Sequence, residues 1–205
     1  MDISEKLFGS AAKVKIIKLF LFNPESVFDI NEVSVRAKVT RGLARREVLN
    51  LLKLGLIKPK NYSKEVNVQK NRKMVSVKKK ASGYIINYKF EHLEQVYNFL
   101  SGSNVLKPED IVAKISKAVK LDLLIIAGFF IKEDDSRVDM LVVGEHIKEA
   151  VLANIIKDLE ANIGREITYA VFTTTEFKYR MSVFDKLVRD ILDYKHEKLV
   201  NKINL

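Results

Sequence analysis

Apolar residues recur at helical spacing in three stretches near the start of the chain. Side chains three and four positions apart share one face of a helix, so this spacing predicts three helices. They run over residues 10–22, 30–37 and 40–54. Only Lys38-Val39 separates the second helix from the third, which is the spacing of a helix-turn-helix.

Polar residues at the ends of these stretches support the helices. Ser10, Asp29 and Thr40 stand where N-caps are expected, because their short side chains can accept a hydrogen bond from the first helical turn. Gly55 follows the third helix, where a left-handed C-cap is expected.

The pattern changes to a period of two between Ile57 and Phe90. Alternation of apolar and polar residues predicts β-strands. A charged turn over residues 69–73 interrupts the alternation, which favours a hairpin, and a third strand after Ser82-Gly83 is left open. A hairpin directly after the third helix indicates a wing.

The second half mixes helices with buried strands. We predict a short helix over 91–100, a linker at 101–104, helices over 108–120 and 147–162, strands over 121–126, 138–143 and 167–172, and an amphipathic helical segment over 175–204. The fold class is therefore α+β. Residues 1–90 form a domain of three helices and a β-wing, 91–104 a helical linker, and 105–205 a small α/β domain with a C-terminal helix.

Composition narrows the class of protein. The chain has no Cys, which excludes a disulfide framework and thiolate chemistry. The longest apolar run covers residues 123–131, far short of the about 18 residues that a membrane span needs. We therefore expect a soluble cytoplasmic protein with no membrane partner. The three histidines, His92, His146 and His196, have no spacing typical of a metal site.

Charge is divided unevenly between the halves. Residues 1–90 hold 20 Lys+Arg against 7 Asp+Glu, whereas residues 91–205 hold 16 against 19. A basic domain joined to a slightly acidic one indicates that one part meets a polyanion, although a solubilising lysine-rich surface is the alternative.

The start of the third helix carries the candidate base-reading residues. Ala44, Val48 and Leu51 are expected to face the core, which leaves the arginines on the opposite face. Arginine suits bidentate contact with guanine, and a glycine there would allow close approach of the backbone to DNA. The candidate DNA-binding residues are Thr40, Arg41, Gly42, Arg45, Arg46 and Asn50 on the helix, and Lys70, Arg72 and Lys73 at the wing tip.

Four short motifs carry a family resemblance in this half. They are LFGSAAKVKI at 7–16, LFLFNP at 19–24, RRE at 45–47 and LGLI at 54–57. They resemble the winged helix-turn-helix that is fused to minimal nucleotidyltransferase domains in bacteria and archaea. The wing, residues 58–90, is longer than is usual in that family.

Three further motifs, LIIAG at 124–128, SRVDMLVVG at 136–144 and GREITYAVF at 164–172, are similar to strands of the nucleotidyltransferase partner. The resemblance implies a Gly-Ser pair and three carboxylates that hold Mg²⁺ against a nucleoside triphosphate. Here Phe129 takes the place of the serine, Arg137 that of the first aspartate, and Thr168 that of the third carboxylate. What remains is a vestigial site of Gly128, Ser136 and Asp139, where Asp139 is expected to pair with Arg137 or a lysine.

We therefore expect a sequence-specific DNA-binding protein, a transcriptional regulator, with no catalytic residues, metal or cofactor. Its inactive second domain would serve dimerisation, a protein partner or a ligand. An active nucleotidyltransferase that modifies a protein or small acceptor is one alternative. It would need Mg²⁺ and a nucleoside triphosphate, with Glu133, Asp134 or Asp135 replacing the lost ligands. An antitoxin-like protein-binding module is the other.

Overall fold

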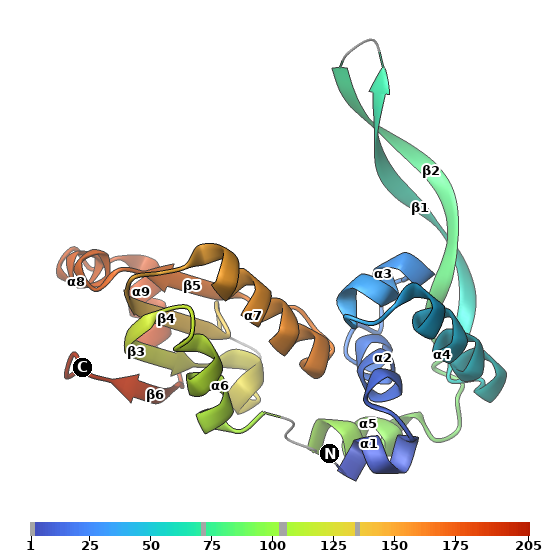
Figure 1. The fold of residues 1–205 in the computed structure, drawn as a ribbon, viewed down its shortest axis with the longest axis horizontal. Coiled ribbons are helices and arrows are strands. Elements are labelled where there is room, and N and C mark those ends of the chain that lie inside the picture. Colours follow the sequence, from blue (N-terminus) through green and yellow to red (C-terminus); the bar gives the residue numbers. More distant parts are fainter. Residues whose placement is uncertain (1–2, 71–72, 103–105, 134–135) are drawn as a thin grey trace. The chain divides into compact units, whose positions relative to one another are not determined.

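The computed structural model of the chain describes residues 3–70, 73–102, 106–133 and 136–205, with the backbone alone for 66–70 and 73–77 (Figure 1). The chain divides into two units. Unit 1 holds residues 1–105 and 160–165, and unit 2 holds residues 106–159 and 166–205. The described residues form nine α-helices and two sheets, so the α+β class is confirmed.

Unit 1 begins with four helices, α1 (Ile3–Phe8), α2 (Ala11–Leu21), α3 (Ile30–Arg36) and α4 (Arg41–Leu54). The three expected N-caps are confirmed, because the side chains of Ser10, Asp29 and Thr40 each accept a backbone N–H of the following turn. Gly55 ends α4 with φ at 80°, a left-handed conformation that glycine adopts without strain. Helix α1 was not predicted.

The turn between α3 and α4 is held by its own hydrogen bonds. Lys38 takes a left-handed conformation with φ at 51°. The Ser34 hydroxyl donates to the Val39 carbonyl oxygen at 2.7 Å, and the Val39 N–H donates to the Ser34 carbonyl at 3.0 Å. These contacts fix the direction in which α4 leaves α3.

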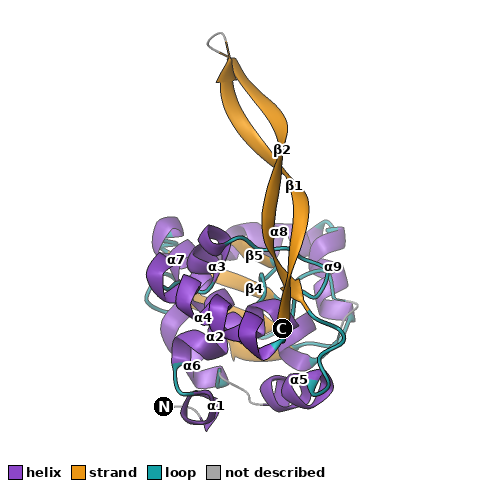
Figure 2. Cartoon of the chain, turned by 90° about the vertical axis from the view of Figure 1, so that its right-hand side faces the viewer, coloured by secondary structure: helices purple, strands orange, loops and turns teal. Residues whose placement is uncertain are grey.

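A long antiparallel hairpin follows α4. Strands β1 (Ile57–Lys70) and β2 (Lys73–Ile86) have 14 residues each and pair throughout. Figures 1 and 2 show a twisted ribbon that extends well beyond the helices of unit 1. The possible third strand after Ser82-Gly83 is wrong, because β2 runs through both residues.

A short bridge from another segment joins the base of the hairpin instead. Phe28 pairs with Tyr84 through backbone hydrogen bonds of 3.0 and 2.9 Å. A Cβ atom on Gly83 would lie 2.8 Å from the Phe28 carbonyl oxygen, so this approach requires glycine. The hairpin is thereby attached to the segment that leads into α3.

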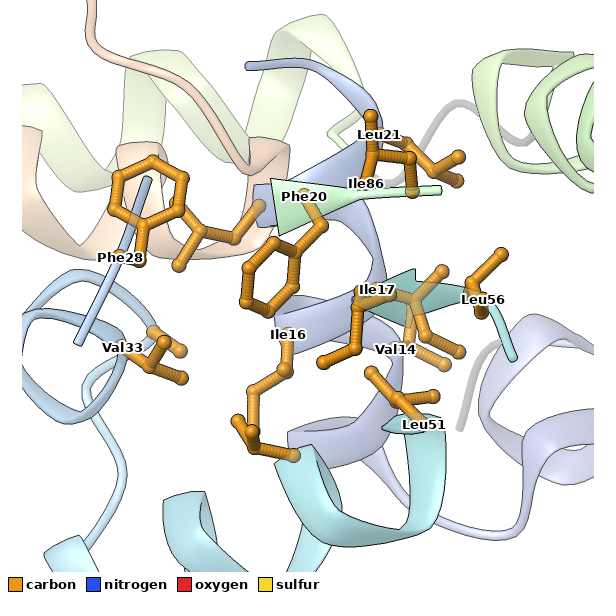
Figure 3. Packing of buried hydrophobic residues seen from close by; sticks show 14 of the residues in the cluster. Val14, Ile16, Ile17, Phe20, Leu21, Phe28, Val33, Leu51, Leu56 and Ile86 are labelled. Atoms are coloured by element: carbon orange, nitrogen blue, oxygen red, sulfur yellow. The ribbon is translucent and has the colours of Figure 1, made fainter. Parts of the chain in front are cut away.

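The core of unit 1 lies between α2, α4 and the hairpin base. Ile17 and Phe20 from α2 pack with Leu51 from α4, with Leu56 just before β1 and with Ile86 at the end of β2 (Figure 3). Helix α5 (Leu93–Gly102) adds its buried Leu100 to the same cluster. Residues expected to form a helical linker are thus packed within unit 1.

Unit 2 contains a four-stranded sheet in the order β5-β4-β3-β6. Strand β3 is antiparallel to β4 and β6, and β4 is parallel to β5. The elements are α6 (Pro108–Ile115), β3 (Lys120–Ile126), the 3-10 helix η1 (Gly128–Ile131), β4 (Met140–Glu145), α7 (Glu149–Ile163), β5 (Tyr169–Phe172), α8 (Thr174–Ser182), α9 (Lys186–Asp193) and β6 (Glu197–Asn201). The last four residues of α7, 160–163, belong to unit 1.

Two sequence expectations for unit 2 need correction. The segment 175–204 is not helical throughout, because α9 ends at Asp193 and β6 pairs with the edge of β3. Helix α6 ends at Ile115, and a turn brings the chain to β3. Among the described residues, no helix combines the length with the apolar composition that a membrane span requires.

Candidate nucleic-acid interface

Helix α4 has one buried face and one basic face. Ala44, Val48 and Leu51 are fully buried against the core, as expected. The structure leaves all six predicted helix residues exposed, namely Thr40, Arg41, Gly42, Arg45, Arg46 and Asn50. Helical geometry therefore brings the three arginines to the solvent side of the first turns.

A buried carboxylate separates these residues into two groups. Glu47 is only 6% exposed and accepts hydrogen bonds from Arg46 Nε and from Asn50 Nδ2, each at 3.3 Å. Within the described residues, Arg41 and Arg45 have no such partner. Sequence reasoning missed Glu47, although a single carboxylate among arginines at a helix start was a visible signal.

Gly42 occupies a position that does not require glycine. A Cβ atom there would meet nothing within 4 Å in the described chain. Glycine inside a helix costs about 1 kcal/mol relative to alanine. A partner that approaches the backbone of α4 closely would explain the residue.

If α4 binds duplex DNA, as the sequence leads us to expect, the variant Gly42→Ala should raise the free energy of unfolding by up to about 1 kcal/mol while lowering affinity for the duplex about tenfold. Urea unfolding and a fluorescence anisotropy titration would measure the two effects. Lys53→Ala, an exposed change in the last turn of α4, is the matched control. An increase in stability with unchanged affinity would contradict close contact between Gly42 and DNA.

The hairpin carries a second group of basic residues, the hairpin lysines, which are divided between its two faces. They are Lys58, Lys60, Lys78, Lys79 and Lys80, and all are exposed. The sequence prediction named the tip instead. Arg72 lies outside the described residues, and for Lys70 and Lys73 the structure gives the backbone only, as the last pair of the ladder. The KKK run at 78–80 was the signal that the prediction overlooked.

An ion-pair cluster joins the hairpin to α3. Lys64 Nζ lies 2.9 Å from Asp29 Oδ2 and 2.7 Å from Glu32 Oε1, and the Tyr62 hydroxyl donates to Glu32 Oε2 at 3.2 Å. Burial and the two carboxylates raise the pKa of Tyr62 to about 12. Burial alone would raise the pKa of Asp29, but the Lys64 ammonium and the Glu32 N–H hold it below its ordinary value. Lys64, at the middle of β1, therefore attaches the hairpin to the start of α3.

Removing this ion pair with Lys64→Met is expected to cost about 1 kcal/mol at pH 7, since the pair is partly exposed. Because the pKa of Asp29 is lowered by folding, its contribution is present above the unfolded pKa of about 3.9 and is lost as pH falls through the folded value. The stability difference from wild type should therefore shrink below about pH 4. Lys60→Met, an exposed lysine of the same strand, is the control for urea unfolding at pH 7 and pH 3. An equal deficit at both pH values would argue against the pair.

The three residues of the vestigial site lie together in unit 2. Asp139 is 7% exposed, and its Oδ1 and Oδ2 accept the backbone N–H groups of Phe129 and Thr168, both at 2.9 Å. A Cβ atom on Gly128 would lie 2.5 Å from Asp139 Oδ1. The Ser136 hydroxyl donates to the carbonyl oxygen of Val138 at 2.7 Å. Asp139 thus ties η1 to the segment before β5.

The expected pairing of Asp139 with Arg137 needs correction, and the described residue of the acidic loop is engaged in an ion pair. Arg137 Nε pairs with Asp190 Oδ2 at 2.6 Å, so the proposed pair of Arg137 with Asp139 is wrong. Glu133 pairs with Lys195 Nζ at 2.7 Å, while Asp134 and Asp135 lie outside the described residues. Among the described residues there is no group of three or more His, Asp or Glu that could hold a metal ion.

Comparison with known proteins adds no relative. No protein-family model matches the chain, and neither a curated protein nor a solved structure matches it significantly. Its function therefore has to be inferred from the geometry of α4, the hairpin and the Asp139 cluster.

Proposed function

We propose that unit 1 is a winged helix that binds double-stranded DNA in a sequence-specific manner and that the protein is a transcriptional regulator. Helix α4 would lie in the major groove, with the hairpin as its wing. The observation that carries the proposal is the position of Arg41 and Arg45 at the start of α4, where both are exposed and have no partner among the described residues. A helix-turn-helix places such residues against base edges.

Two further observations support this role. Backbone and Ser34 hydrogen bonds hold the short α3–α4 turn and set the direction of α4 relative to α3. The hairpin lysines add cationic side chains that suit phosphate contacts, which position a protein on the duplex without reading its sequence. Because Arg46 already has Glu47 as a partner, we assign base reading to Arg41 and Arg45.

For unit 2 we propose an inactive nucleotidyltransferase-like domain. Asp139 is the only carboxylate that matches the family's metal ligands, and both of its oxygens accept backbone hydrogen bonds. Carboxylate oxygens used in this way are poorly placed to hold Mg²⁺ at an open catalytic site. A role in dimerisation or in partner binding is compatible with such a domain.

Selection of bound duplexes from a random library tests the proposal directly. We expect an enriched motif that contains guanines, because arginine reads guanine O6 and N7. Paired half-sites about one helical turn apart would identify a dimer. Retention of duplexes without any enriched motif would contradict sequence-specific binding.

Affinity for the selected duplex should fall steeply with salt. If about six Lys and Arg side chains displace counterions, the logarithm of the binding constant should decrease with a slope of about −5 against the logarithm of salt concentration. Anisotropy titrations between 50 and 200 mM salt would measure this slope. Over that range the affinity should fall about a thousandfold. A flat response would remove the electrostatic basis of the proposal.

A further inference from the structure

A groove in unit 1 is lined by apolar and acidic residues, although the unit as a whole is basic. It has a volume of about 450 Å³, within the range of about 300–1,000 Å³ that is typical of small-molecule sites. Buried Leu21 from α2 and Ile86 from the end of β2 line it. The groove therefore lies where the hairpin base meets the core, and not on the basic face of α4.

Aromatic side chains form much of its wall. Tyr88 and Phe90 follow β2, and Tyr97 comes from α5. The ring of Tyr97 is held edge-on against Phe22, with the ring centres 5.5 Å apart. The Tyr88 hydroxyl donates to Glu25 Oε1 at 2.6 Å. Two of the three aromatic side chains thus have contacts that hold them at the groove.

The charged residues that line the groove within the described chain are acidic. They are Glu91 and Glu94, and none of the described residues that line it is a Lys, Arg or His. Neither carboxylate has a hydrogen bond or ion pair among the described residues, although residues 1–90 carry 20 Lys+Arg against 7 Asp+Glu. Two unpaired carboxylates beside aromatic rings in a basic domain are complementary to an organic cation.

We propose that this groove binds a small organic cation with an apolar body, such as an aromatic or alkyl ammonium compound. The ammonium group would lie between Glu91 and Glu94 and against the ring faces, since cation–π contacts favour such a position. The apolar body would rest on Phe90 and Leu93, which line the groove and are partly exposed. Anionic ligands would be repelled, so the groove is distinct from the surface proposed for DNA, and the inference does not depend on that surface.

Isothermal titration calorimetry tests the site. Benzyltrimethylammonium is titrated into the full chain in the absence of DNA. Benzyl alcohol and phenylacetate serve as neutral and anionic probes of similar size. We expect saturable one-to-one binding of the cation and at least tenfold weaker binding of the other two probes. Equal binding of benzyl alcohol would reduce the site to a hydrophobic groove and overturn the proposal, as would no binding of the cation.

Two variants locate the binding. Glu91→Gln with Glu94→Gln should weaken cation binding about fivefold, because two exposed charge contacts are lost. Tyr97→Leu, which keeps an apolar side chain but removes the ring face, should weaken it about threefold. Glu5→Gln with Glu65→Gln removes the same charge elsewhere in unit 1 and should change nothing. The proposal fails if this control weakens binding as much as the groove variant does.

Discussion

Replacing Arg41 and Arg45 together with alanine should lower affinity for the selected duplex by a factor of about 10² to 10⁴. Each bidentate contact of arginine with guanine contributes about 1–3 kcal/mol of discrimination. Both side chains are exposed and have no partner in the described structure, so their removal should leave the fold intact. Anisotropy titrations at one fixed salt concentration, with specific and scrambled duplexes, would measure the loss.

Lysine substitutions at positions 41 and 45 separate the effect of the arginine charge on DNA binding from the effect of the guanidinium shape. Arg41→Lys with Arg45→Lys keeps both charges but removes the planar fork, so specific binding should fall while binding to scrambled DNA stays close to wild type. Lys186→Ala with Arg189→Ala removes two exposed charges from α9 and should have little effect. If this control lost as much affinity as the α4 variant, α4 would not be the recognition helix.

The largest effect on stability is expected from Asp139→Asn. The amide keeps one acceptor oxygen, but its NH₂ group must face either the Phe129 or the Thr168 N–H, which then loses its partner. An unsatisfied buried N–H costs about 1–3 kcal/mol, and the remaining hydrogen bond loses its charge. We expect unit 2 to be destabilised by about 2–4 kcal/mol. Urea unfolding and hydrogen exchange at Phe129 and Thr168 would measure it.

The control for this variant is Asp193→Asn, which affects a 66% exposed carboxylate that lies 3.8 Å from Arg189. It should change stability by less than about 0.5 kcal/mol. A loss at Asp139 no larger than that of the control would contradict the structural role assigned to this carboxylate.

An assay of nucleotide transfer by the wild type and by Asp139→Asn distinguishes a regulator from an enzyme. With labelled nucleoside triphosphates and Mg²⁺ or Mn²⁺, we expect no nucleotide transfer by the wild type. Labelling that disappears in Asp139→Asn, at a temperature where the variant is still folded, would favour the nucleotidyltransferase alternative. The assay is run over a range of acceptors, because that alternative allows a protein or a small molecule.

The sequence predicted those parts of the fold that depend on local chemistry. The N-caps and the Gly55 end of α4 follow from side chains that bond their own backbone neighbours, and the burial of Ala44, Val48 and Leu51 follows from helical spacing. The same local patterns gave the hairpin, because alternation and a charged turn are contained in one segment.

The features that the sequence did not predict depend on residues far apart in the chain. The contact of Lys64 with Asp29 and Glu32 joins positions more than 30 residues apart, and the sequence of neither segment alone predicts it. Strand β6 is recognisable only through its pairing with β3, since five residues with helical neighbours carry little signal of their own. The partners of Asp139 are backbone groups, which no side-chain motif reveals.

The hairpin also raises a question of solubility. A sheet of only two long strands has an edge on each side, and unpaired N–H and C=O groups on edges can pair with other chains. Lysines along an edge oppose such association through their charge and hydration. Substituting Lys78, Lys79 and Lys80 to weaken phosphate contacts would therefore also remove protection against aggregation. Light scattering should accompany any such titration, so that self-association is not mistaken for lost DNA binding.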